Sequence, residues 1–233
     1  MKRKTIFLFA LLFVLCSLIS GCSNSTPEAA IANLFQALSD HKDQEELWAF
    51  CPAEQLSEGY TPRAGDIPST SSPPPEKYRL NFQQQLLVKV TSLLYEDTGG
   101  YDFWPPEIDD PAAIPPEEYV LYTNSMVAHI EAPIKVIRCD FPLSEDSEKY
   151  NYTKDMWNRY ADSYQAEDST ERVILIEYKG KTYLIGCILI KYNGDWGIVE
   201  LYSYTLSMSD GTPCIPMSEA EYNQNMKNNW ESY

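Results

Sequence analysis

The clearest candidate for acid–base chemistry is a histidine followed two residues later by a glutamate, His129 and Glu131. The residues around them are rich in apolar and β-branched types, although the run 120–130 can also be drawn as a helix. On a strand, residues two apart share a face, so this pair could act as general acid and base inside a cavity. No second motif points to the same chemistry, so a structural or exposed His129 is the favoured interpretation. The other histidine, His41, lies in a polar run and is expected in an exposed turn.

Other motifs that would support catalysis or metal binding are absent from the sequence. The acidic clusters 107–110 and 145–148 lack the spacing and the turn glycine of an EF-hand, so we interpret them as solvated charge. No Gly-x-Ser-x-Gly elbow surrounds a serine, and no glycine-rich phosphate loop occurs. The sequence therefore predicts no metal site and no cofactor.

Aromatic residues form a second candidate site. The chain has 17 tyrosines and five tryptophans, and several gather near the end of the strand-rich region. If 196–204 is one strand, alternation places Trp196, Tyr202 and Tyr204 on one face. Such a face could bind a sugar, a peptide or another protein, because aromatic rings combine apolar area with a polar edge. Packing into the core is the favoured alternative.

The N-terminal segment indicates where the protein resides. A short basic start is followed by an apolar run, Ile6 to Leu18, which matches a secretory signal and is too short to span a bilayer. The following Ser20-Gly21-Cys22 resembles the lipobox of bacterial lipoproteins. That resemblance implies that residues 1–21 are removed and that Cys22 becomes a lipidated N-terminus carrying diacylglycerol and palmitate. An ordinary secretory signal with an incidental cysteine is the alternative.

Charge limits the partners of the mature chain. Cleavage before Cys22 leaves 212 of the 233 residues and, by removing Lys2, Arg3 and Lys4, takes the formal charge from −16 to −19. So acidic a protein is repelled by nucleic acid and by anionic lipid headgroups. We therefore expect an extracytoplasmic protein that is held at the bacterial cell membrane by lipid alone. An envelope protein, a peptide or a glycan is a possible partner, and nucleic acid is not.

Four cysteines remain after Cys16 leaves with the signal and Cys22 is lipidated. They are Cys51, Cys139, Cys187 and Cys214. Outside the cytoplasm they could form disulfides in three full connectivities, among which the sequence does not choose. Buried unpaired thiols are the alternative. Zinc is disfavoured because no two of them are close in sequence.

The helical patterns follow a very short tether, residues 22–25. Thr26-Pro27-Glu28 predicts a helix start, with a capping hydroxyl and a proline at the first helical position. A second short helix is expected after Asp43, and a third, of about 18 residues, from Glu76. The Gly/Pro-rich stretches 53–75 and 95–118 are interpreted as loop insertions.

The second half of the chain is typical of an antiparallel meander. A strand is expected near 137–141 and a helix over 153–166. Three strand-like runs, 172–178, 182–192 and 196–204, are joined at Lys179-Gly180 and Asn193-Gly194. Asn-Gly between apolar runs favours a type I′ hairpin turn. A capping-box pattern at Ser218 predicts a C-terminal helix through Trp230.

This order of elements resembles the nuclear transport factor 2-like (cystatin-like cone) superfamily, chiefly over residues 26–50 and 170–205. The resemblance implies one α+β domain, residues 26–233, in which N-terminal helices pack on the concave face of a curved antiparallel sheet. Since that superfamily contains both enzymes and non-enzymes, the fold does not determine the function. Our leading hypothesis is a non-catalytic, membrane-anchored ligand- or partner-binding module of the cell envelope. The alternatives are a small-molecule enzyme using His129 and Glu131, and an accessory domain of cell-wall assembly.

Overall fold

The computed structural model describes residues 24–61, 72–95 and 116–231. The signal segment with Cys22, the acidic cluster 107–110 and most of the two expected loop insertions lie outside the described residues. Within the described part of the chain, no helix is both long and apolar enough to cross a bilayer.

The centre of the fold is an antiparallel sheet whose main strands run in the order β1-β2-β3-β4, with β5 paired to β3. The strands are β1 (Lys135–Asp140), β2 (Asp168–Tyr178), β3 (Lys181–Tyr192), β4 (Asp195–Glu200) and β5 (Ile215–Pro216). Both hairpin turns have positive φ at their two central residues, 49° and 78° at Lys179-Gly180 and 53° and 85° at Asn193-Gly194. This is the backbone that a type I′ turn requires, and it confirms the meander of β2, β3 and β4.

The described residues form seven helices, and three of these have an N-cap side chain that accepts a backbone hydrogen bond. The seven helices are α2 (Pro27–Ser39), α3 (Gln44–Trp48), α4 (Ala53–Gly59), α5 (Pro75–Leu94), α6 (Pro116–Ala128), α7 (Tyr150–Ser163) and α8 (Glu219–Lys227). Thr26 Oγ1 accepts from Ala29 N at 3.1 Å, and Asp43 and Ser218 each form a full capping box. The expected starts of α2, α3 and α8 are therefore confirmed.

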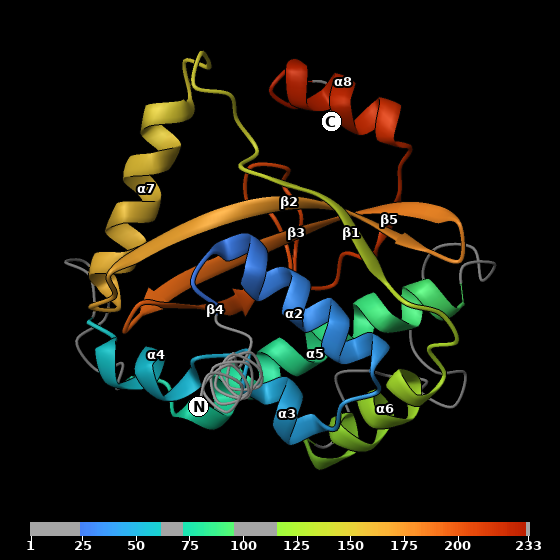
Figure 1. Cartoon of the computed structure of the whole chain (residues 1–233). Coiled ribbons are helices and arrows are strands. Elements are labelled where there is room, and N and C mark those ends of the chain that lie inside the picture. Colours follow the sequence, from blue (N-terminus) through green and yellow to red (C-terminus); the bar gives the residue numbers. More distant parts are fainter. Residues whose placement is uncertain (1–23, 62–71, 96–115, 232–233) are drawn as a thin grey trace, which may run out of the picture.

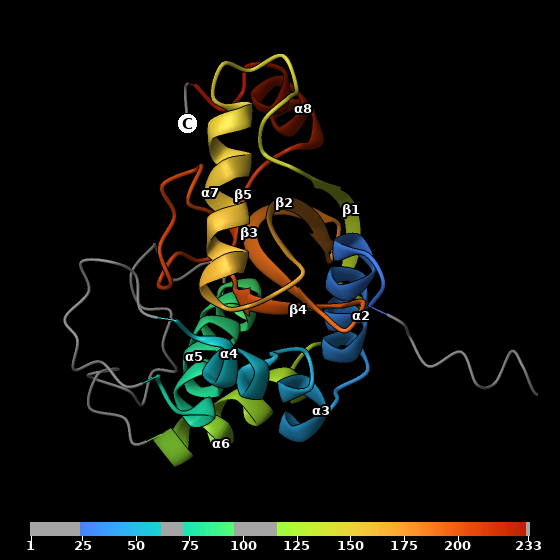
Figure 2. The same ribbon diagram turned by 90° about the vertical axis from the view of Figure 1, so that its left-hand side faces the viewer.

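The sheet is buried on both faces. Ile174, Ile176 and Ile185 point into a core shared with α2, α5 and α6, on the concave side of the sheet in Figure 1. The alternate residues Val173 and Leu184 point the other way, toward α8 and the segment that follows β4. Figure 2 shows the sheet between α7 and α2. The expected fold class, an α+β domain with N-terminal helices on the concave face of a curved antiparallel sheet, is confirmed.

One open assignment is settled and one expected loop boundary is wrong. Residues 120–130 belong mostly to helix α6, because Thr123, Met126, Val127 and Ile130 are buried at three- and four-residue spacing against the concave-side core. The stretch 53–75 is not loop throughout, since α4 occupies its first seven residues and buries Ala53 and Leu56. In both places, tertiary burial selects a helix that local composition did not favour.

Candidate functional site

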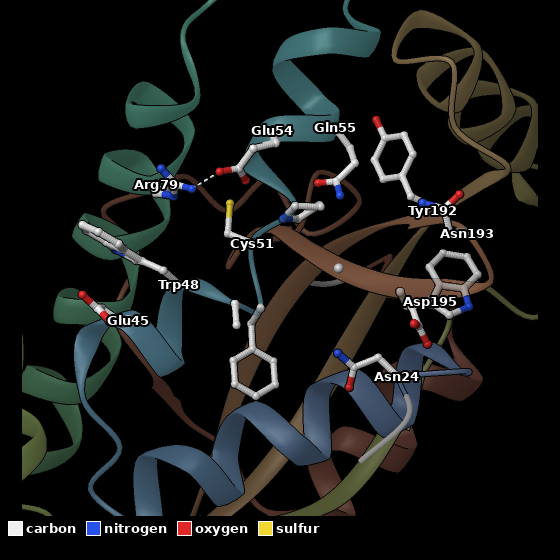
Figure 3. A pocket seen from close by; sticks show the side chains of 15 residues that line it. Asn24, Glu45, Trp48, Cys51, Glu54, Gln55, Arg79, Tyr192, Asn193 and Asp195 are labelled. Atoms are coloured by element: carbon white, nitrogen blue, oxygen red, sulfur yellow. Dashed lines mark hydrogen bonds and ion pairs between the residues drawn. The ribbon is translucent and has the colours of Figure 1, made fainter. Parts of the chain in front are cut away.

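An open cleft of about 670 Å³ lies where the segment between α3 and α4 meets the β3–β4 hairpin. Figure 3 shows Trp48 and Arg79 on one side of the cleft and Tyr192 and Asp195 on the other, with Asn24 at its lower border. The cleft thus unites residues from the N-terminus, α3, α4, α5 and the sheet.

Two backbone hydrogen bonds to the outer edge of β4 hold the cleft together. Trp196 N donates to Asn24 O, and Ile198 N donates to Phe50 O, each at 2.8 Å. Between them, Gly197 lies against Pro52, and a Cβ atom at Gly197 would be only 2.6 Å from the proline ring. A glycine is needed at this position so that the α3–α4 segment can approach the strand.

The N-terminal side of the cleft is fixed from the first described residue. The side chain of Asn24 accepts a hydrogen bond from Asn33 Nδ2 at 2.8 Å, in addition to the backbone bond with Trp196. Cys22 is two positions earlier in the sequence.

The charged groups of the cleft are mostly acidic. The guanidinium of Arg79 forms an ion pair with Glu54 and lies 5.6 Å from the ring centroid of Trp48. Glu45 and Asp195 are exposed, and neither forms an ion pair with another described residue. Three carboxylates against one guanidinium give the lining a net formal charge of −2.

Burial disfavours ionisation of two side chains that line the cleft. Burial raises the pKa of the Cys51 thiol to about 12 and raises the pKa of Tyr192 above its ordinary value. No histidine is among the described residues that line the cleft. The lining combines half-buried aromatic rings with carboxylates and amides, which are groups that can bind a ligand.

The expected acid–base pair does not occupy a cavity. His129 lies just after the end of α6, is exposed, and its Nδ1 is 2.6 Å from Ser125 O. Glu131 is paired with Lys179 at 2.5 Å, and this hydrogen bond lowers the pKa of the carboxyl. Because the chain here leaves a helix and is not a strand, the geometry that the enzyme alternative required is absent, and His129 is exposed, as in the favoured interpretation.

The expected aromatic face is divided between two places. Trp196 is buried in the core and borders the cleft, but β4 ends at Glu200, before Tyr202 and Tyr204. Those tyrosines pack beside α7, with the Tyr204 ring 5.8 Å from that of Trp157 and the two hydroxyls 3.0 Å apart. The prediction that the three residues share a face was therefore wrong.

Two features of β3 explain why β4 ends before Tyr202. The pairing of β3 with β4 has an irregular register between Ile188 and Leu189, opposite the end of β4. The chain then turns so that Ser203 lies against Gly186, where a Cβ atom would be 2.3 Å from Ser203 N. Alternation cannot continue through this irregularity and turn.

Buried charged groups secure the segment that follows β4. Glu171 accepts hydrogen bonds from Ser203 Oγ, Thr205 N (3.1 Å) and Thr205 Oγ1 (2.8 Å), while burial raises its pKa. Lys89, on α5, donates to Thr212 O, and burial lowers its pKa to about 8. These contacts satisfy buried polar groups of the fold and lie outside the cleft.

The four described cysteines, Cys51, Cys139, Cys187 and Cys214, are unpaired. Cys139 on β1 and Cys187 on β3 are separated by β2, and strands two apart are about 9.5 Å from each other, too far for a disulfide. Cys22 lies outside the described residues. Among those residues, no group of three or more His, Cys, Asp or Glu side chains could hold a metal ion.

Sequence reasoning missed most of the cleft. Asn24, Glu45, Trp48 and Arg79 carried no signal of a site in the sequence. The one indication was the Asn193-Gly194 turn, which fixes one side of the cleft. Nothing in the sequence indicates that residues near 24, 50, 79 and 195 meet.

Comparison with known proteins adds little. No family model matches the chain, and no curated protein matches it. A solved structure of a cystatin-like protein from Ruminococcus gnavus is similar at 19% identity and a TM-score of 0.44, over 87% of this chain and 43% of that one. The chain thus spans less than half the length of the structure that it matches.

Proposed function

We propose that the mature protein is an extracytoplasmic lipoprotein, anchored to the bacterial cell membrane through Cys22, that binds a ligand through the cleft beside its N-terminus without catalysing a reaction. Its folded domain would be a cone-like member of the nuclear transport factor 2-like class. The signal and lipobox pattern of residues 1–22 supports the anchor, and the lining of the cleft supports binding.

The observation that carries the proposal is the position of Asn24. It borders the cleft and is hydrogen-bonded to β4, two residues after the cysteine expected to carry lipid. An anchor at Cys22 would hold this end of the domain at the membrane surface, because no long tether intervenes. The cleft would then meet ligands that are attached to the membrane or concentrated near it.

Mass spectrometry of protein purified from membranes tests the anchor. We expect loss of residues 1–21 and the added mass of a diacylated Cys22. Cys22→Ala should leave the uncleaved precursor, and Ser23→Ala serves as a control that keeps the cysteine. A mature protein that begins at another residue, or that has no added lipid, would refute the anchor.

A titration tests the cleft as a binding site. Full-length lipidated protein in nonionic detergent would be titrated with N-acetylglucosamine, glycerol phosphate and an acetylated lysine amide. Trp48→Ala should abolish the binding of whichever probe binds, while His129→Ala, outside the cleft, should not change it. Binding that Trp48→Ala leaves intact would show that the site lies elsewhere.

A further inference from the structure

We propose that the cleft recognises a positively charged group, an ammonium or guanidinium, on a ligand at the membrane surface. This inference rests on the proposed function of the cleft as the binding site and specifies the chemistry of its ligand. It follows from the balance of charge in the cleft, from the way the cleft already holds one cation, and from its distance to Cys22.

The balance of charge excludes an anion as the favoured ligand. Arg79 is the one cationic side chain among the described residues of the lining, and its guanidinium is already paired with Glu54. A phosphate or carboxylate would enter without a free cation to meet it and would face the carboxylates of Glu45 and Asp195. Bringing like charges together in a partly desolvated cleft is unfavourable.

Arg79 shows how the cleft binds a cation. Its guanidinium lies between the face of an aromatic ring, Trp48, and a carboxylate, Glu54. A ring face and a carboxylate are together the usual partners of ammonium and guanidinium groups. In Figure 3, Glu45 lies near Trp48 on one side of the cleft, and Asp195 lies on the other side with Tyr192. Neither carboxylate forms an ion pair with another described residue, and the ring of Tyr192 is half-buried, so a cation from outside the chain can meet a carboxylate near an aromatic ring.

The N-terminal attachment sets where this group would be met. Cys22 is two positions before Asn24 in the sequence, so a lipid anchor there would hold the cleft near the membrane surface. Within a Debye length of about 8 Å, an anionic membrane surface attracts cations and repels soluble anions. The positive group could therefore belong to an amine-bearing lipid headgroup or to a soluble amine enriched at the surface, and both present the same ammonium.

The test compares a cationic probe with its neutral equivalent. Full-length lipidated protein in nonionic detergent is titrated with Nα-acetyl-lysine methylamide and with the same compound acetylated on Nε. We expect saturable binding of the cationic probe, weaker at high salt, and about tenfold weaker binding of the neutral probe. Glu45→Gln combined with Asp195→Asn should weaken binding about fivefold. The control Glu145→Gln with Asp146→Asn makes the same change of charge in an exposed acidic cluster elsewhere and should leave the affinity unchanged.

Two membrane arms separate the sources of the amine. The soluble probe is titrated in phosphatidylethanolamine nanodiscs and in phosphatidylglycerol nanodiscs. Weaker apparent binding in phosphatidylethanolamine would assign the site to the lipid headgroup, because its amine competes with the probe. Equal binding in both would assign it to a soluble amine. Equal affinity for the charged and neutral probes, preference for glycerol phosphate, or no binding of the cationic probe at millimolar concentration would overturn the proposal. If the cationic probe fails but N-acetylglucosamine binds, and Trp48→Ala abolishes that binding, the proposed binding function of the cleft would still be supported.

Discussion

The two ends of strand β4 bring aromatic side chains and carboxylates together with opposite results. Near its start, Trp48, Tyr192 and Trp196 border an open cleft, and Asp195 has no ion-pair partner among the described residues. Beyond its end, Trp157 is buried beneath Tyr202 and Tyr204, of which Tyr204 stays 52% exposed, and nearby Glu171 accepts three hydrogen bonds. Aromatic content alone therefore does not identify a binding surface. What differs is that the rings near the start of β4 border a cleft, whereas those beyond its end stack on one another and on buried Trp157.

Glycines in two neighbouring strands produce this difference. Gly186 lets the backbone at Ser203 fold directly onto β3, which closes the far end. Gly197 lets Pro52 touch β4, but the segment that carries Pro52 then diverges toward α4 and leaves the cleft beside it. The same lack of a Cβ atom closes one region and shapes the other.

The largest expected contrast comes from removing one tryptophan in each region. Trp157 is 2% exposed, so Trp157→Ala should lower the free energy of unfolding by about 3–5 kcal/mol. Trp48 is half-buried at the cleft, so Trp48→Ala should cost about 1–2 kcal/mol while removing ligand binding. Urea denaturation measures both, and equal losses of stability would erase the distinction between the two regions.

Lys89 allows a pH test of the closed region. Its pKa is about 8 in the folded protein, lowered mainly by burial, and about 10.4 in an unfolded chain. Between these values the unfolded state holds the proton that the folded state has lost, so stability should rise with pH by up to about 3 kcal/mol. Lys89→Met should abolish that rise.

The measurement compares the unfolding free energies of Lys89→Met and the parent chain from pH 7 to 10. Taking the difference between the two chains separates the effect of Lys89 from that of the tyrosines, which also titrate in this range. A difference independent of pH would show that Lys89 keeps an ordinary pKa and lies in a region that is not closed.

The two glycines themselves give the next smaller effects. Gly186→Ala places a Cβ atom against backbone that cannot move aside, so we expect a loss of about 2–3 kcal/mol in unfolding free energy. Gly197→Ala meets only the ring of Pro52 and should cost about 1 kcal/mol while changing ligand affinity. Thermal unfolding and ligand titration on both variants measure this, and a reversed order would contradict the account of how each region is shaped.

The smallest effect is expected for the ion pair in the cleft. The side chains of Arg79 and Glu54 are 26% and 54% exposed, so Glu54→Gln should change the unfolding free energy by at most about 0.5 kcal/mol. The same change should raise the affinity for anions, because it frees the guanidinium. Urea denaturation with a glycerol phosphate titration checks both parts. A large loss of stability would show that the pair belongs to the structural core.

The sequence predicts those parts of the fold that local chemistry determines. The caps at Thr26 and Ser218 and the Asn193-Gly194 turn need only short-range contacts, so their positions could be predicted. The two-residue alternation of β2 and β3 likewise assigns their side chains to opposite faces.

The candidate site depended instead on contacts distant in sequence. The end of β4 is set by the approach of Ser203 to Gly186, so the faces of Tyr202 and Tyr204 could not be deduced from alternation. The choice between strand and helix for residues 120–130 stayed open in the sequence, because burial against residues far along the chain is what selects helix α6. The cleft joins four separate parts of the chain, and no spacing rule indicates that they meet.

The central claim, that the region beside Asn24 is open for a cationic ligand while Trp157, beyond the end of β4, is buried, has one direct test. Full-length lipidated protein labelled with 5-fluorotryptophan would be titrated with Nα-acetyl-lysine methylamide and followed by ¹⁹F NMR, with each signal assigned by substitution. We predict that the resonances of Trp48 and Trp196 shift together and saturate, while those of Trp157 and Trp230 do not move. A shift of Trp157 that saturates at lower probe concentration, or no shift at Trp48, would contradict the account.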